Sequence, residues 1–169
     1  AAGAATATAG QNTFVGYHAG LQNTSIQNTF MGFNAGQANT GGAFNTFIGN
    51  LSGVSNNIGN QNTFIGDSSG MANTNGDANV FIGQGSGDAN QSGNENVFIG
   101  TDAGGANTGG DRNVIIGANA GLLSLASDNI FIGHNAGKTN SIANDNIFIG
   151  SGTGLNNDFG QFNVFMGSD

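Results

Sequence analysis

The two histidines, His18 and His134, are the side chains of this sequence best suited to bind a metal ion or to transfer a proton near neutral pH. They stand at adjacent positions of a repeat, in units seven copies apart. If each unit adds one β-strand spacing, about 33 Å separates them within one chain. They therefore cannot share an active site, although each could meet its own copies across a symmetry axis and hold a metal or an anion. We favour ordinary exposed histidines at corners of the fold.

The acidic side chains do not form the clusters that catalysis or calcium binding requires. A solenoid that cleaves glycosides needs acids gathered in a groove, and a calcium-binding β-roll needs repeated Gly-Gly-x-Gly-x-Asp units, of which only the fragment Gly109-Gly110-Asp111 occurs. Even spacing favours solubility and edge protection, so we predict no enzyme, no cofactor and no metal site. The acids are Asp67, Asp77, Asp88, Glu95, Asp102, Asp111, Asp128, Asp145, Asp158 and Asp169.

The composition excludes several other classes of protein. The chain has no cysteine, so it has no disulfide framework, no thiolate metal site and no thiol nucleophile. Lys+Arg 2 against Asp+Glu 10 gives a net charge of −8, which repels phosphate backbones and anionic lipids. No apolar run approaches the roughly 20 residues of a membrane-spanning helix. We therefore expect neither a nucleic-acid partner nor membrane insertion.

The apolar residues gather in a five-residue motif, the pentad, which reads Asn, Thr/Val/Ile, Phe/Ile, Ile/Val/Met, Gly. It begins ten units; the units that start at Asn12 and Asn113 are short, with sixteen positions, and the other complete units are long, with seventeen. A second glycine follows the pentad's own glycine by four positions, and a second asparagine follows the pentad asparagine by eleven, except that Ser124 replaces it in one unit. The pentad asparagines are Asn12, Asn28, Asn45, Asn62, Asn79, Asn96, Asn113, Asn129, Asn146 and Asn163.

This repeat predicts a β-solenoid. Helical repeats need units of roughly 30 residues, and glycine at this density would break their helices. Each unit then makes one coil: the pentad is a short strand, the glycines form tight corners, and the Asn/Thr stretch is a second strand or a turn. Coils stacked about 4.8 Å apart give a rod roughly 45 Å long. We expect an all-β parallel β-roll of about ten coils, with residues 1–169 forming one domain.

Stacking places the central residues of the pentads in one column, where aromatic rings can pack offset along the rod. That column is Phe14, Phe30, Phe47, Phe64, Phe81, Phe98, Ile115, Phe131, Phe148 and Phe165. On the opposite face of the strand runs Val15, Met31, Ile48, Ile65, Ile82, Ile99, Ile116, Ile132, Ile149 and Met166. Beside it the residue after the pentad asparagine changes from Thr13, Thr29, Thr46 and Thr63 to valine or isoleucine.

A strand that is apolar on both faces must be buried on both. One column can fill the thin interior of the coil, but the other half of each coil offers only small or polar residues to cover the second. A monomer that exposed so long an apolar stripe would aggregate. We therefore expect a homo-oligomer with its coil axes side by side, and a homotrimer fits such a narrow bundle best.

The repeated asparagines have two interpretations. In the first, which we favour, their stacked amides hydrogen-bond along the rod and tie corners to the backbone. In the second they form a carbohydrate-binding array. The two residues after each pentad glycine vary most and should form an exposed corner. Of these we select Tyr17, His18 and Phe33 as candidate binding residues, because exposed aromatic rings suit sugar stacking; alternatively, Phe33 and Phe44 pad the edge of the coil or trimer.

The pentad, followed by a small residue and glycine, resembles two related families. One is the head of trimeric autotransporter adhesins (YadA-like), with repeats like Ser-Val-Ala-Ile-Gly. The other comprises Asn-Thr-Ala-Val-Gly-type repeats in tail-fibre and surface-fibre proteins of phages and bacteria. The match covers residues 12–167, but here Phe replaces the usual small central residue and the coil is longer than the adhesin unit. The resemblance implies a left-handed homotrimer, extracellular on a bacterial cell surface or phage virion, attaching to a carbohydrate or protein receptor.

Three functions follow as hypotheses. The leading one is a structural or adhesive fibre segment that acts as attachment head or spacer. The second is a filament subunit that stacks head to tail, because Ala1 to Gln11 and Ser168-Asp169 are complementary portions of one coil. A segment cut from a longer fibre also explains these complementary ends, and we favour that explanation because it requires no further contact. The third is an ice-binding solenoid, which is disfavoured because the exposed Asn-Thr pairs are interrupted at Asn57, Gln91, Leu125, Ser141 and Asp158.

Overall fold

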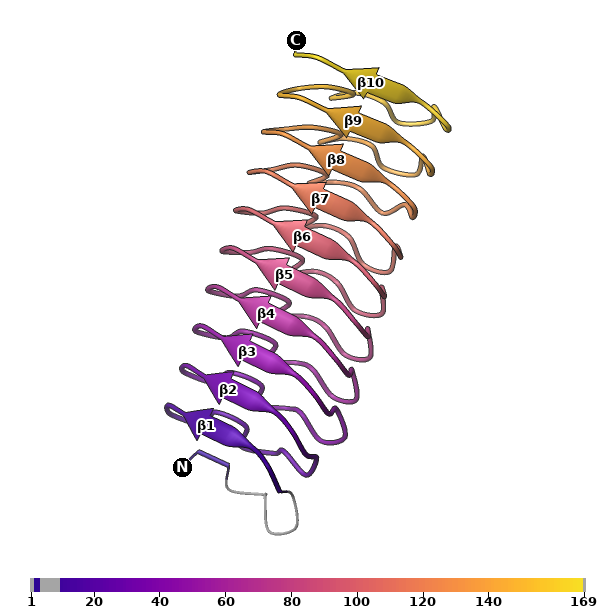
Figure 1. Cartoon of the computed structure of the whole chain (residues 1–169). Coiled ribbons are helices and arrows are strands. Elements are labelled where there is room, and N and C mark those ends of the chain that lie inside the picture. The colour runs from indigo at the N-terminus through magenta and orange to yellow at the C-terminus, as the bar shows by residue number, and fades with distance from the viewer. Residues whose placement is uncertain (1, 4–9, 169) are drawn as a thin grey trace.

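The computed structural model describes residues 2–3 and 10–168. The chain winds into a single stack of coils, with the two ends of the chain at opposite ends of the stack (Figure 1). The described residues contain ten strands and no helix. The strands are β1 (Thr13–Val15), β2 (Thr29–Met31), β3 (Thr46–Ile48), β4 (Thr63–Ile65), β5 (Val80–Ile82), β6 (Val97–Ile99), β7 (Val114–Ile116), β8 (Ile130–Ile132), β9 (Ile147–Ile149) and β10 (Val164–Met166).

These strands form one parallel sheet in which every strand pairs with the next one along the chain. Each pentad is in register with its neighbours, so that Phe30 pairs with Phe47 and Phe47 with Phe64. The predicted parallel β-solenoid of about ten coils is therefore confirmed. The sheet register is the same across short and long units, as the pairing of Phe14 with Phe30 across a short unit shows.

The central column of the pentads fills the interior of the coil. From Phe30 to Phe148 its side chains are fully buried, and consecutive rings such as Phe47 and Phe64 are stacked with centroids 4.8 Å apart and planes 8° from parallel. This distance equals the spacing of β-strands, so the rings stack at the pitch that the backbone sets. Buried alanines such as Ala35 and Ala103 fill the rest of the core.

The glycine that ends each pentad marks a place where neighbouring coils nearly touch. At Gly66, whose φ is +138°, an added Cβ would lie 2.5 Å from the carbonyl oxygen of Gly83 in the next coil. Neither the backbone angle nor the space admits a side chain there. This requirement explains why glycine ends all ten pentads of the sequence.

The Asn/Thr stretch forms turns, which decides between the two structures predicted for it. Its backbone still bonds to the next coil: the N–H of Gly53 donates to the carbonyl of Ser69 at 3.0 Å, and that of Asn57 to Thr74 at 3.0 Å. At the start of the chain, the N–H of Gly3 donates to the carbonyl of Ala19 at 2.9 Å. Backbone hydrogen bonds thus join the coils on the turn side as well as in the sheet.

Candidate functional site

The pentad asparagines form a buried ladder inside the coil corner. The Asn62 Oδ1 accepts a hydrogen bond from the backbone N–H of Asn79 at 2.9 Å, and its Nδ2 donates to the carbonyl of Gly76 at 2.8 Å. Each amide therefore bonds one backbone group of the next coil and one of the turn. The N–H of Asn79 would otherwise be buried without a partner, whereas the carbonyl of Gly76 also accepts from Nδ2 of Asn73 at 3.1 Å.

The second asparagine of each unit forms a ladder of side chains. The Nδ2 of Asn56 donates to Oδ1 of Asn39 at 2.7 Å and to the carbonyl of Gly59 at 3.0 Å. The Nδ2 of Asn73 in turn donates to Oδ1 of Asn56 at 2.6 Å. Because these side chains are fully buried, they cannot touch a carbohydrate. Their hydrogen bonds run along the rod and tie the corners to the backbone, as the structural interpretation of the repeated asparagines predicts.

This second ladder is interrupted where Ser124 replaces asparagine. Among the described residues, Oδ1 of Asn90, Nδ2 of Asn107 and Oγ of Ser124 are buried without a hydrogen-bond partner. The Asn107 amide is turned so that its Oδ1 accepts from the N–H of Gly110 at 2.9 Å. The substitution thus leaves three polar atoms of adjacent coils unpaired.

The outer sheet face, defined as the residues on either side of the central one in each pentad, is an apolar surface that runs the length of the described sheet. In β3 to β9 these side chains are half-buried. No charged residue occurs on this face. From Val80 onward both of its columns are aliphatic, whereas in β1 to β4 one column is threonine.

The aromatic corner, formed by Tyr17, His18 and Phe33, brings the three candidate binding residues together. The rings of Tyr17 and Phe33 are stacked with centroids 5.5 Å apart and planes 11° from parallel, and the rings of Tyr17 and His18 have centroids 3.8 Å apart. Tyr17 is 59% exposed and Phe33 is 50% exposed. Tyr17 and Phe33 stack face to face, and His18 lies close to Tyr17. The ring faces on which a sugar would stack are therefore partly covered by the neighbouring rings.

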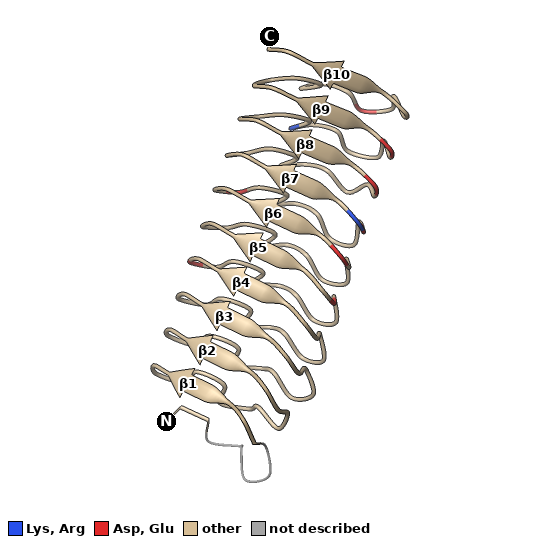
Figure 2. Cartoon of the chain, viewed as in Figure 1, with Lys and Arg blue, Asp and Glu red and all other residues tan. Residues whose placement is uncertain are grey.

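The charged residues are not spread evenly over the rod. Figure 2 shows that red and blue segments gather along the turn that precedes the strands β5 to β9. We call this the charged edge; its residues lie one or two positions before a pentad asparagine and are Asp77, Glu95, Asp111, Arg112, Asp128 and Asp145. More than half of the described acids share this edge, and the others, Asp67, Asp88, Asp102 and Asp158, lie at other positions of the coil. Asp169 lies outside the described residues.

Along the charged edge, polar side chains form a third ladder, which is solvent-accessible. The Oδ1 of Asp111 accepts hydrogen bonds from the backbone N–H of Asn94 at 2.7 Å and from its Nδ2 at 3.2 Å. The N–H of Asp77 donates to Oδ1 of Asn94 at 2.9 Å. Asparagine and aspartate can alternate here because the contact between two coils needs only one acceptor oxygen. The second carboxylate oxygen of each aspartate is left free.

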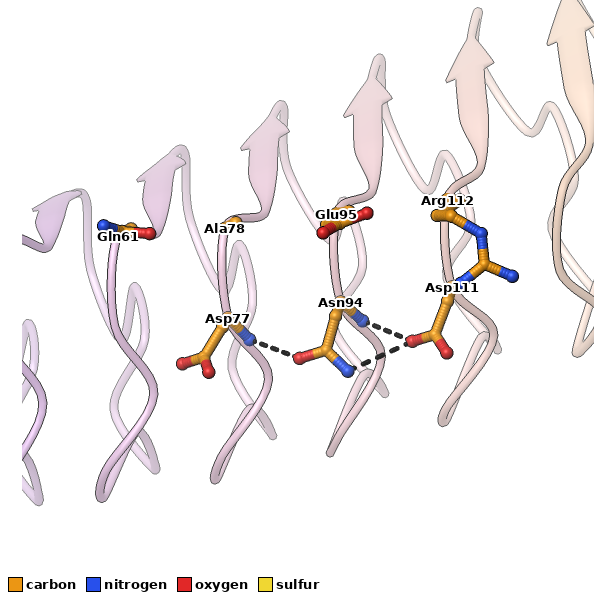
Figure 3. Close-up of a pocket in the computed structure, with 7 residues that line it drawn as sticks. All are labelled: Gln61, Asp77, Ala78, Asn94, Glu95, Asp111 and Arg112. Atoms are coloured by element: carbon orange, nitrogen blue, oxygen red, sulfur yellow. Dashed lines mark hydrogen bonds between the residues drawn. The ribbon is translucent and has the colours of Figure 1, made fainter.

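A pocket of about 420 Å³ lies on this edge, between two rows of side chains (Figure 3). Ala78 occupies one row between Gln61 and Glu95, where the neighbouring coils carry long side chains. The hollow exists because alanine leaves that place in the row empty. We call it the Ala78 pocket; its lining is Gln61, Asp77, Ala78, Asn94, Glu95, Asp111 and Arg112.

Arg112, at one end of the pocket, is held by Asp128. Its Nε donates to Oδ1 of Asp128 at 2.7 Å and its Nη2 donates to Oδ2 at 2.8 Å. These hydrogen bonds and the opposite charge lower the pKa of the Asp128 carboxyl and raise the pKa of Arg112. Both groups are accessible to water, so the pair contributes little to stability. Its effect is to fix the guanidinium beside the pocket.

Asp88 lies on a different part of the coil. Partial burial, and secondarily the charge of Asp102, raises the pKa of its carboxyl above the ordinary value. The cost of burying this carboxylate is thus only partly offset by hydrogen bonds from the backbone N–H groups of Ala89 and Asp88.

His18 and His134 lie in coils far apart, as their units predict, and Asn135 contacts the ring of His134, with 3.2 Å between its Nδ2 and the ring Nδ1. Within the described part of the chain, no group of three or more His, Asp or Glu side chains is placed to hold a metal ion. In the same residues no helix has the length and apolarity to cross a membrane.

Comparison of the chain with protein-family models, with curated proteins and with solved structures gives no match. The candidate surfaces are therefore those that the geometry itself offers: the outer sheet face, the aromatic corner and the Ala78 pocket. The Ala78 pocket was not predicted from the repeated motif. The signal that could have found it is the residue directly before each pentad asparagine, compared from coil to coil.

Proposed function

We propose that the chain is a structural and adhesive fibre segment that associates as a parallel homotrimer of left-handed coils. The observation that carries this proposal is the outer sheet face. One of its columns is apolar along the whole described sheet, the other is threonine in β1 to β4 and aliphatic from Val80 onward, and neither carries a charge, while the charged edge and the corners stay accessible to water. Such a distribution suits a rod that buries one side against its copies and presents the others.

The size of the face supports association along the whole rod rather than at one point. Ten strands of three residues give a face of about 45 by 10 Å, or roughly 900 Å² of flat area for two copies. Stable interfaces bury about 1,200 Å² or more of accessible surface. Even the whole face of two rods falls short of that value, so association needs the full length of the rods and contacts beyond the outer sheet face. The change from Thr63 to Val80 also makes the two ends of the face differ in polarity. Parallel packing in register places the aliphatic parts of neighbouring copies against each other.

The role follows from this assembly. A bundle of regular rods holds its corners at fixed distances from its base, as an attachment head or spacer does. This is the function of the fibre proteins that the pentad resembles, and an extracellular place on a bacterial cell or phage is part of the same proposal. A host-surface carbohydrate or protein is the partner that it implies.

The test is the mass of the particle in solution by light scattering, together with negative-stain imaging. A discrete particle of three chains supports the proposal. Long fibres would favour the alternative of subunits stacked head to tail, and a soluble monomer at all concentrations would overturn association.

A matched set of variants ties the mass to the outer sheet face. Replacing Val80, Val97 and Val114 with threonine copies the column found at Thr46 and Thr63, so the fold should persist while association weakens. The reverse change, Thr46→Val with Thr63→Val, should strengthen association. If neither set shifts the mass, the outer sheet face is not the interface.

The ice-binding alternative has less support. A surface that orders water must repeat one pattern, and the exposed column after the buried asparagines changes from Thr74 to Gln91, Thr108 and Leu125. Strong thermal hysteresis in a freezing assay would nevertheless reverse this ranking.

A further inference from the structure

The Ala78 pocket is a part of the rod where free polar groups surround a hollow. Its volume of about 420 Å³ falls within the range of small-molecule sites, roughly 300–1,000 Å³. Gln61 and Glu95, on either side of Ala78, are two coils apart, and each coil adds 4.8 Å as the Phe64 and Phe81 rings show. The opening therefore has about the width of a sugar ring.

The hydrogen-bonding groups around this hollow are not consumed by the fold. The amide of Gln61 and the carboxylate of Glu95 make no hydrogen bond within the described residues. Asp77 and Asp111 use Oδ1 to accept bonds from the coil before them, which leaves each Oδ2 available. Arg112 gives two of its nitrogens to Asp128 and keeps its Nη1.

These side chains are planar groups with paired donors or acceptors. The amide of Gln61 and the carboxylate of Glu95 keep both polar atoms, so each can hydrogen-bond two neighbouring hydroxyls at once. The two aspartates and Arg112 each offer the one atom that the fold leaves available. The methyl group of Ala78 gives the floor a small apolar surface. Three carboxylates stand against one arginine that is already paired, so phosphorylated, sulfated and other anionic ligands are repelled.

We propose that the Ala78 pocket binds a neutral saccharide of one or two sugar units. The hydroxyls would bond to Gln61, Glu95 and Asp111, and the ring would lie over Ala78. The inference rests on the proposed adhesive function and names the partner as carbohydrate, but it moves the binding surface from the aromatic corner to the charged edge.

The experiment is a titration of the ¹⁵N-labelled chain with glucose, galactose, N-acetylglucosamine, maltose and lactose, followed by the backbone amide signals. Glucosamine and glucuronic acid are added as a cationic and an anionic probe. We expect at least one neutral sugar to shift the signals of Gln61, Ala78, Glu95 and Asp111, and glucuronic acid to bind more weakly than its neutral counterpart.

Ala78→Phe fills the hollow and should weaken sugar binding about tenfold or more, because it removes the space and the contacts with both rows. The backbone accepts phenylalanine at this place: Phe44 occupies it two coils earlier with φ of 62°, close to the 57° of Ala78. Ala118→Phe is the matched control, since Phe33 fills the equivalent place on another corner. It should leave binding unchanged.

Glu95→Gln and Asp111→Asn test the lining without changing its shape. The second of these keeps the acceptor oxygen that Asn94 needs, so the fold should persist while sugar binding falls several-fold, as expected when charged acceptors are lost. The proposal is overturned if no neutral sugar shifts these signals, if only glucosamine does, or if Ala78→Phe binds as well as the parent chain. Because the particle mass is measured separately, a trimer without sugar binding contradicts this inference and leaves the proposed assembly standing.

Discussion

The ring of Phe47 lies against the α-carbon of Gly53, which follows it in the same coil. A Cβ on Gly53 would come within 2.7 Å of Cδ2 and Cε2 of that ring, and the φ of Gly53 is +55°. The large residue at the centre of the pentad and the glycine after it are thus two parts of one packing unit. The aromatic ring fits into the thin coil only because the opposite wall has no side chain.

We therefore expect Gly53→Ala to destabilise the rod by about 1–3 kcal/mol, because the ring must shift within a filled core. Urea unfolding followed by circular dichroism measures this. Gly41→Ala is the control, since its Cβ would meet nothing closer than Ile58 at 3.4 Å. Equal unfolding midpoints for the two variants would contradict the packing argument.

Truncating a pentad asparagine should cost more than truncating an exposed one. Asn62→Ala leaves the N–H of Asn79 buried without a partner, which costs about 1–3 kcal/mol. The carbonyl of Gly76 also loses one of its two bonds and keeps the one from Nδ2 of Asn73 at 3.1 Å. Asn75→Ala, at an exposed position, should change the unfolding midpoint little. The same urea titration compares them, and a harmless Asn62→Ala would show that the ladder is dispensable.

Ser124→Asn should stabilise the chain by about 1 kcal/mol for each bond restored. The new amide can donate to Asn107 once the Asn107 amide rotates to meet Asn90. Ser124 stands in a short unit, and Asn23 in the other short unit donates to the carbonyl two positions on, Ser25, at 2.7 Å. The carbonyl of Ala126 offers the same partner.

Thermal unfolding measures the gain at Ser124, and Ser92→Asn at an exposed position is the control. A lower melting temperature for Ser124→Asn would mean that the short unit has no room for the amide.

Asp88 should make the stability fall as pH rises through the acid range. Burial, then the charge of Asp102, raises the pKa of its carboxyl in the folded chain above 3.8. The folded state therefore binds the proton more tightly than the unfolded state, so this group favours folding below pH 3.8 and loses that contribution as pH rises through the raised value.

Asp88→Asn should consequently be more stable than the parent chain at neutral pH, with the difference shrinking as the pH approaches the ordinary aspartate value. Asp102→Asn should give part of the effect, because it removes the neighbouring charge but not the burial. Unfolding midpoints measured from the acid range up to neutral pH test this. A difference that does not depend on pH would rule out the carboxyl as its source.

Much of the fold could be predicted because the repeat fixes what stacks on what. Once Phe30, Phe47 and Phe64 share a column, the parallel register and the filled interior follow from strand spacing alone. The sequence could not decide whether the Asn/Thr stretch is a turn or a second strand. Glycine and asparagine suit a tight turn, but asparagines that repeat in register also suit a stacked ladder of strands.

The charged edge and its pocket escaped prediction for a geometric reason. Asp111 and Asp128 are separated by the length of a long unit and look equivalent, but the unit between Asn113 and Asn129 is short. Asp128 therefore moves one column over and meets Arg112. The Ala78 pocket depends on the absence of a side chain among long neighbours, which no motif records.

Each coil meets its neighbours through the same ring stack and the same strand pairing, whatever residues stand at its corners. Removing residues 79–95 would delete one complete turn and bring the coil that begins at Asn96 onto the one that begins at Asn62. The rod would shorten by one step of 4.8 Å and keep its cross-section. The length of the rod is therefore set in equal steps by the number of coils, and substitutions at the corners change its surface without changing that length.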